Sequence, residues 1–253
     1  MKYFVFGDVH GFFDEWQKAL NEAGFDINNP EHILVSLGDI TDRGPKSKEC
    51  LEFIMNKVPV GRRILITGNH EDLMEEAICR KMFLMHDIHN GTRKSAYELT
   101  GLDPENVYDD EVCRAMKYND LWNSYVGSCI DYAEVGDYIF VHGWIPCFDM
   151  WGRAFYNRDN WREGDWKKAR WINGMEAWNQ GIRIEDKTIV CGHWHTSWGH
   201  SHLHNVGCEW EQPWISDKID TSMHSEPFID KGIIAMDACT AISGRVNIIT
   251  FDD

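Results

Sequence analysis

The chain has 253 residues, 43% apolar and 26% charged, which is typical of a folded globular protein rather than a disordered one. Its formal net charge of −16 argues against a broad nucleic-acid-binding face, which needs a basic surface. Eight cysteines without a CxxC pair, the lack of a signal-peptide pattern and the lack of a run of ~18 apolar residues favour a cytoplasmic protein that does not enter membranes.

The first part of the chain alternates apolar runs with helical patterns. Three continuous apolar runs predict buried strands, at residues 2–6, 32–39 and 63–71. Amphipathic patterns after each run predict helices, at residues 14–25, 45–58 and 71–82. This alternation is typical of βαβ units in an α/β fold, with a sheet covered on both faces.

The second part of the chain returns to strands after a long interruption. Residues 80–135 are mostly helical and are interpreted as a cap insertion rather than a separate domain. Apolar runs predict further strands at 138–143 and 188–195, and two more within 232–251. The Trp-rich segment 146–187 is interpreted as a lid packed on the core, so the whole chain, 1–253, is expected to form one domain.

Polar clusters follow five of the predicted strands where each strand ends. They read GDVHG at 7–11, GDITDRG at 38–44, GNHE at 68–71, HGW at 142–144 and GHWH at 192–195. Because strand ends meet at one edge of an α/β sheet, we expect these side chains to lie together. The ligand-type residues among them are Asp8, His10, Asp39, Asn69, His142, His193 and His195. This mixture suits borderline divalent ions, and seven residues suit a pair of ions that shares a carboxylate.

Each cluster has an ordinary explanation when it is taken alone. The two histidines of GHWH are compatible with a plain surface position, and the Asn of GNHE is compatible with a helix cap. Five such clusters at five strand ends are not explained by coincidence. The joint pattern therefore indicates a metal site.

The clusters resemble the motifs of the calcineurin-like metallophosphoesterase superfamily, which run GDxHG, GDxxDRG, GNHE, a lone His and GHxH. The HGWIP stretch at 142–146 and the HNG turn at 89–91 are most similar to the bacterial and phage branch of the serine/threonine phosphoprotein phosphatases. Diadenosine tetraphosphate hydrolases share much of the pattern. The resemblance implies a central β-sandwich flanked by helices, with a dinuclear metal site at the C-terminal ends of the strands.

The resemblance also implies which residues hold the two ions. The first ion would be held by Asp8, His10, Asp39 and plausibly His195, which many phosphoprotein phosphatases lack. The second would be held by Asp39, Asn69, His142 and His193, so that Asp39 bridges the pair. Two divalent ions, most simply Mn²⁺ with Fe or Zn as alternatives, outweigh the two carboxylate charges and attract a phosphate. A hydroxide bridging the ions would then attack the phosphorus in line.

Further roles follow from the same resemblance. His70 is expected to act as the general acid, with Asp42 pairing to it and Arg43 forking onto the phosphate. An alternative is that Asp42 and Arg43 pair with each other at the surface. The second phosphate-binding arginine of the phosphatases, in a W-x-R motif, has no direct match beside Trp171, and Arg170 or Asn173 are the candidates to replace it.

The predicted function is hydrolysis of phosphomonoesters, on a phosphorylated protein or a small phosphoester. A diester or a dinucleoside polyphosphate is the alternative substrate within the same chemistry. A metal-binding scaffold without catalysis is an alternative of another class, and the complete residue set including His70 argues against it. Neither a membrane nor a nucleic acid is expected as a partner.

Overall fold

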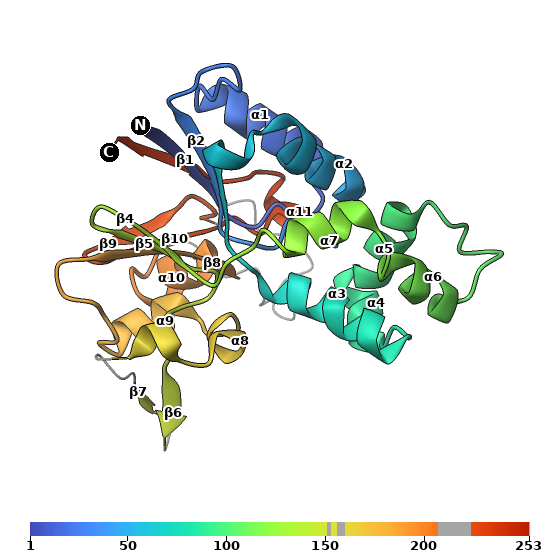
Figure 1. Ribbon diagram of the computed structural model, residues 1–253. Helices are drawn as coiled ribbons and strands as arrows, with labels where there is room; N and C mark the ends of the chain where they lie inside the picture. Colours follow the sequence, from blue (N-terminus) through green and yellow to red (C-terminus); the bar gives the residue numbers. More distant parts are fainter. Residues whose placement is uncertain (151–152, 156–159, 207–223, 253) are drawn as a thin grey trace.

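The computed structural model describes residues 1–150, 153–155, 160–206 and 224–252, which form two stacked β-sheets with helices on the outside (Figure 1). The first sheet has the order β11-β1-β2-β3, with bounds Ile248–Asp252, Lys2–Phe6, His32–Ser36 and Arg63–Leu65. The second has the order β4-β5-β8-β10-β9, with bounds Ala133–Val135, Tyr138–Phe140, Thr188–His195, Ile233–Asp237 and Phe228–Asp230. Strands β6 (Phe148–Met150) and β7 (Arg153–Phe155) form a small, separate antiparallel sheet. The predicted α/β class and central β-sandwich are confirmed.

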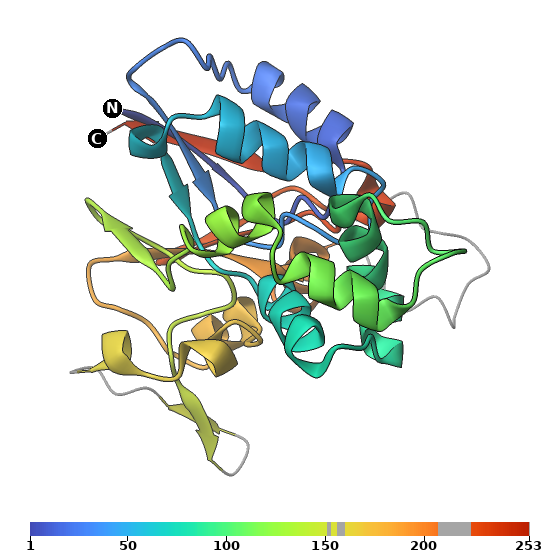
Figure 2. The ribbon, with the colours of Figure 1, turned by 45° about the vertical axis from the view of Figure 1, so that its right-hand side comes forward.

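Parallel pairing in both sheets gathers the strand ends that carry the polar clusters. Strands β1, β2 and β3 are parallel, and β11 runs antiparallel at one edge. In the second sheet β5, β8 and β10 are parallel, with β4 and β9 antiparallel at the edges. The chain termini lie side by side at the end of the first sheet that is opposite the polar clusters (Figures 1 and 2).

Side-chain alternation along the strands divides the core into layers. In β1, Phe4 and Phe6 pack with the helices on the outer face, whereas Val5 points between the sheets. Phe140 and Met236 meet Val5 from the second sheet. The first sheet is therefore covered by helices on one face and by the second sheet on the other.

Helices α1 (Phe13–Glu22) and α2 (Ser47–Glu52) cover the outer face of the first sheet (Figure 1). Trp16 and Leu20 of α1 are buried there. The helix predicted at 45–58 is instead α2 followed by a π-helical turn, Phe53–Lys57, and a 3₁₀ turn, Val60–Arg62, precedes β3.

Five helices stand between β3 and β4 in the chain: α3 (Asn69–Arg80), α4 (Met85–Asn90), α5 (Thr92–Thr100), α6 (Asp109–Met116) and α7 (Asp120–Val126). They lie together beside α2, away from the second sheet (Figures 1 and 2). Val112, Trp122 and Tyr125 of this group belong to the same buried cluster as Phe4 and Trp16. The helical character expected for 80–135 is thus present, and its role as a cap stays a prediction.

The outer face of the second sheet is packed with tryptophans. Trp161, Trp166 and Trp178 are buried with Ile189 and Ala235 of that sheet. The short elements that carry or flank them are a 3₁₀ turn, Trp161–Glu163, and helices α8 (Trp166–Ala169), α9 (Gly174–Asn179) and α10 (Thr196–His202). The predicted lid 146–187 includes residues 151–152 and 156–159, which lie outside the described residues, and it stays a prediction.

Two boundaries differ from the sequence prediction for identifiable reasons. The strands predicted to reach 39 and 71 end at Ser36 and Leu65, because the polar clusters turn away from extended backbone. The two strands within 232–251 belong to different sheets, and α11 (Thr240–Ser243) with Gly244 in a left-handed conformation carries the chain between them.

Among the described residues, no helix combines the length and the apolar character needed to cross a membrane.

Candidate metal and catalytic site

The polar clusters turn sharply at the strand ends because several of their residues adopt left-handed backbone. The φ angles are +49° at His10, +52° at Asp39, +77° at Asp42, +58° at Arg43 and +66° at His193. Residues with a side chain avoid this region, and each one costs on the order of 1–3 kcal/mol. Such strain concentrated in one place is typical of a functional site.

Glycine is required where the loops after β2 and β3 meet. Gly38 has a φ of +100°, and a Cβ there would lie 2.6 Å from the Gly68 backbone nitrogen and 2.9 Å from His142 Nδ1. Only a residue without a side chain allows this approach. The close contact brings the cluster after β2 against the clusters after β3 and β5.

Asp39 occupies the centre of the site. Its Oδ2 lies 3.7 Å from His10 Nε2, 3.8 Å from His70 Nε2 and 3.4 Å from His142 Nε2. Two groups of ligand atoms within 4.8 Å of one another both contain it: His10, Asp39 and His70, and Asp39, His142 and His193. A carboxylate shared by two groups of donors is the arrangement expected of a residue that bridges two ions.

Backbone carbonyls fix the orientation of two histidines. The Nδ1 atom of His10 lies 3.0 Å from the Thr41 carbonyl, and that of His142 lies 2.7 Å from the Leu37 carbonyl. Each Nδ1–H therefore donates to backbone, which leaves each Nε2 facing Asp39 and able to bind a metal ion once it is deprotonated. His10 Nε2 is buried without a hydrogen-bond partner. A buried polar atom of this kind normally has a partner, and a metal ion would be a suitable one.

The remaining predicted ligands surround these groups. Asn69 Oδ1 lies 2.8 Å from His142 Nε2, on the side of the second group. Both carboxylate oxygens of Asp8 accept from the His193 backbone N–H at 3.1 Å. His195 lies beside Asp237, with 3.7 Å between Nε2 and Oδ2. Neither Asp8 nor His195 is part of the two compact groups.

The structure pairs Asp42 with His70. His70 Nδ1 lies 2.7 Å from Asp42 Oδ2, which also accepts from the Thr92 hydroxyl at 2.6 Å. Asp42 is fully buried, whereas Arg43 is exposed with its Nη2 3.4 Å from His70 Nε2. Arg43 is thus at the mouth of the site, where an anion can reach it.

Burial and the charges in the site shift the pKa values of its histidines in opposite directions. Burial lowers the pKa of His70, but the charge of Asp39 and the hydrogen bond to Asp42 outweigh it and leave that pKa raised. In the same way Asp39 outweighs burial and raises the pKa of His142 to about 10. Burial and the neighbouring His142 lower the pKa of His193 to about 3. Burial and the charge of Arg43 also lower the pKa of His10.

The two predicted carboxylate ligands also differ. Burial alone would raise the pKa of Asp39, but His142 and His70 hold it well below its usual value. Burial and the charge of Asp237 raise the pKa of Asp8 well above its usual value. Asp39 is therefore stabilised as an anion by the protein itself, whereas Asp8 needs a further cation to favour its charged form.

The two candidates for the second phosphate-binding residue have structural partners. Arg170 is mostly buried and forms ion pairs with Asp72, at 2.7 Å, and with Asp131. Asn173 caps α9 by accepting from the Glu176 backbone N–H at 3.2 Å. Trp171 between them is 47% exposed, and its ring lies 5.8 Å from that of His193. Phosphate binding by Arg170 or Asn173 stays a prediction.

Glu71 is a residue of the site whose role the sequence analysis missed. It is buried, and its Oε2 accepts from the backbone N–H groups of Asp39, at 3.0 Å, and Gly68, at 2.7 Å. Its Oε1 accepts from the Ile40 N–H at 3.2 Å and from the Tyr125 hydroxyl at 3.0 Å. Glu71 therefore clamps the loops after β2 and β3 to each other. Its place in GNHE was the available signal, whereas nothing in the sequence marked Tyr125.

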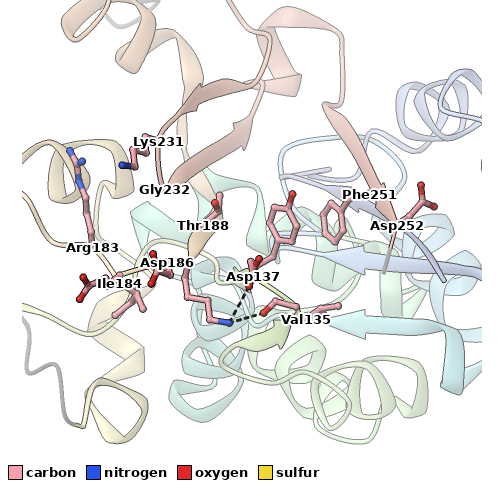
Figure 3. Close-up of a pocket in the computed structure, with 14 residues that line it drawn as sticks. Val135, Asp137, Arg183, Ile184, Asp186, Thr188, Lys231, Gly232, Phe251 and Asp252 are labelled. Atoms are coloured by element: carbon pink, nitrogen blue, oxygen red, sulfur yellow. Dashed lines mark hydrogen bonds and ion pairs between the residues drawn. The ribbon is translucent and has the colours of Figure 1, made fainter.

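A hollow of about 780 Å³ lies among the turns where the strands of the second sheet begin. Figure 3 shows Arg183 and Lys231 on one side of it and Asp137 on the other. Lys187 Nζ contacts the Gly136 carbonyl at 2.7 Å. None of the predicted site residues lines this hollow.

Comparisons with known proteins show which family the chain resembles. A family model described as calcineurin-like phosphoesterase matches residues 1–215. Among curated proteins, an asymmetrical bis(5′-nucleosyl)-tetraphosphatase PrpE of Bacillus velezensis is 29% identical over 165 residues, covering 59% of each chain. Serine/threonine-protein phosphatase 1 of Salmonella typhimurium is 40% identical over 73 residues, covering 29% of this chain and 31% of that protein. The matches thus span three fifths or less of these relatives.

The fold is also found among solved structures. A cold-active protein-tyrosine phosphatase of a psychrophilic Shewanella species superposes with a TM-score of 0.55, at 15% identity, covering 100% of this chain and 75% of the other. At this identity the similarity shows the shared fold alone.

Proposed function

The chain belongs to the calcineurin-like phosphoesterase family, and we propose that it is a metal-dependent phosphatase that hydrolyses phosphate monoesters. The family places it among hydrolases of the metallophosphoesterase superfamily. The observation that carries the proposal is the position of Asp39 in both ligand groups, next to His70. This arrangement would combine a two-ion site with a general acid.

The residues present fit two divalent ions, of which Mn²⁺ is the simplest choice. Asp8, His10 and Asp39, with His195, would hold one ion, and the buried Nε2 of His10, which has no hydrogen-bond partner, supports this. Asp39, Asn69, His142 and His193 would hold the other. When bound, two such ions activate water as a nucleophile and stabilise the phosphate oxygens during in-line displacement.

His70 would supply the proton to the leaving group. The Asp42 carboxylate fixes the Nδ1–H of the ring, and it favours the imidazolium, whose Nε2–H is the proton to be donated. Two hydroxyl groups hold Asp42 in place. The Thr92 hydroxyl donates to the Asp42 carboxylate at 2.6 Å, and the Ser95 hydroxyl accepts from the Asp42 backbone N–H at 3.0 Å. The start of α5 would therefore position the acid through Asp42.

Arg43 would bind the phosphate. It is exposed, and its guanidinium lies next to the nitrogen that is expected to face the leaving-group oxygen. A guanidinium makes two parallel hydrogen bonds to a phosphate, and a monoester dianion offers more charge for them than a diester monoanion does. This difference favours monoesters, on a phosphorylated protein or a small molecule.

A second candidate function is hydrolysis of a dinucleoside polyphosphate. It is favoured by the name of a relative that matches 59% of the chain, an asymmetrical bis(5′-nucleosyl)-tetraphosphatase. Arg170 also favours it indirectly, since its ion pairs with Asp72 and Asp131 reduce its availability for a monoester dianion.

The test is a comparison of kcat/KM for three substrates under one Mn²⁺ condition. A phosphoserine peptide, an aryl phosphodiester and diadenosine tetraphosphate are given to the wild-type protein, with Asp39→Asn as the inactive control. The monoester is expected to be the best substrate. If either of the others is preferred by more than about tenfold, ~1.4 kcal/mol of transition-state binding, the monoester proposal is wrong. Mn²⁺ binding without turnover of any substrate would instead indicate a scaffold.

A further inference from the structure

Asp237 is a buried carboxylate to which neither the sequence analysis nor the proposed function assigns a role. It ends β10 and is fully buried. Its Oδ1 accepts from the Cys239 backbone N–H at 2.8 Å, while its Oδ2 is buried without a hydrogen-bond partner. A buried carboxylate oxygen without a donor is costly unless a cation compensates its charge.

A break in strand register places this carboxylate opposite His195. Strands β8 and β10 pair regularly up to Cys191 and Ala235, and the register then shifts so that Asp237 pairs with His195. Irregularities of this kind re-aim side chains next to active sites. Here His193, within the irregular stretch, joins the second ligand group, and His195 Nε2 lies 3.7 Å from Asp237 Oδ2.

Asp8, a predicted ligand of the first ion, is hydrogen-bonded to the segments that carry Asp237 and His195. Thr240 begins α11, three residues after Asp237, and its hydroxyl donates a hydrogen bond to the Asp8 carbonyl at 2.9 Å. The Asp8 carboxylate accepts from the backbone N–H of His193, in the strand that pairs with Asp237. Three acceptor or ligand groups, on Asp8, His195 and Asp237, therefore share one corner of the site.

We propose that Asp237 is a positioning residue of the metal centre that holds His195 beside Asp8 and strengthens binding of the ion on that side. Its carboxylate adds a third negative charge to those of Asp8 and Asp39, which increases the attraction for a cation. A carboxylate next to a ligand histidine also fixes the ring, and its loss typically costs 10–100-fold in metal affinity. This role rests on the proposed function, because it requires that the site hold two ions.

The test is Asp237→Asn, which keeps the shape of the side chain and the oxygen that accepts from Cys239 N–H. Mn²⁺ affinity is measured by calorimetric titration of metal-free protein, and melting temperature is measured without metal and at saturating Mn²⁺. One of the two binding events is expected to weaken by 10–100-fold, and the other by less than threefold. The metal-free variant is expected to melt at or above the wild-type temperature, because a buried charge beside Asp8 is removed.

Asp87→Asn is the matched control, since Asp87 is equally buried and its Oδ1 also faces a histidine without a hydrogen bond, 3.0 Å from His86 Nε2, but its Oδ2 pairs with Arg80 in the helical insertion. It is expected to lower the melting temperature by the same amount with and without Mn²⁺. A merely structural Asp237 would behave in this way, and that result would overturn the proposal.

The variant His195→Asn separates the positioning role from a general effect of charge. If Asp237 acts through His195, the single variants weaken the same binding event, and the double variant weakens it little more than either one. Independent effects that multiply would contradict the proposal. Two Mn²⁺ ions bound equally by wild type and Asp237→Asn would reject the role of Asp237 alone, whereas a wild-type protein that binds no Mn²⁺ would reject the proposed function itself.

Discussion

Replacing Glu71 with Gln tests whether the clamp between the strand-end loops supports the metal centre. Each carboxylate oxygen of Glu71 accepts two hydrogen bonds, so no orientation of the amide reproduces the pattern. The best orientation turns the NH₂ group toward Tyr125, whose hydroxyl can reverse and accept. The backbone N–H of Ile40 then loses its acceptor, and the N–H groups of Asp39 and Gly68 keep only a neutral one.

The expected loss of stability follows from these bonds. Hydrogen bonds to a charged group contribute about 1.5–3 kcal/mol and neutral ones about 0.5–1.5 kcal/mol, and an unpaired buried N–H costs about 1–3 kcal/mol. Burial and the Asp39 charge raise the pKa of Glu71, so removing its charge relieves part of the cost. We therefore expect the free energy of unfolding to fall by about 2 kcal/mol in the metal-free protein.

The assay is urea unfolding of metal-free protein together with Mn²⁺ titration. Because Glu71 holds the Asp39 backbone, both Mn²⁺ affinities are expected to fall in Glu71→Gln. Glu52→Gln, an exposed residue on α2, removes the same charge and is expected to change stability by less than about 0.5 kcal/mol. A Glu71→Gln protein that unfolds within this margin of wild type and binds Mn²⁺ normally would refute the reasoning.

Three further outcomes are expected from the site. Asp39→Asn should remove activity and most bound metal together, because Asp39 belongs to both ligand groups; metal analysis after dialysis checks this, and two retained ions would refute the bridging role. His70→Asn should keep both ions but slow hydrolysis of alkyl phosphates by about 10²–10⁴-fold, with a smaller effect on aryl phosphates; equal losses on both would argue against the acid role. Chelation of the metal should abolish activity and lower the melting temperature, and Mn²⁺ should restore both, as followed by activity and calorimetry; a chelated protein with full activity would exclude metal-dependent hydrolysis.

The family and the sandwich were predictable because the chemistry of the site is concentrated in short motifs. Asp39 and His70 stand in clusters whose residue types and position after apolar runs are visible without a structure. Strand ends were placed too late, since the left-handed conformation of Asp39 and its neighbours interrupts a run that remains apolar in composition.

The supporting residues were not predictable from the sequence. Tyr125 reaches Glu71 across 54 positions of the chain, and Asp237 faces His195 only because the register of two parallel strands shifts. Neither contact follows from local periodicity or from a motif. Long-range pairings of this kind depend on tertiary packing, and sequence spacing carries no information about them.

The buried carboxylates explain how an acidic protein can present a site suited to phosphate. Glu71 is neutralised locally by backbone N–H groups, and Asp42 by His70 and a hydroxyl, so neither directs its charge at the substrate. Asp39 lies among three histidines, whereas burial and a like charge raise the pKa of Asp8, which favours a cation at its corner. Together with the exposed Arg43, ions held there would outweigh the acidic groups near the mouth. The formal net charge of −16 is a sum over the whole chain, and the local partners of each carboxylate decide what the site attracts.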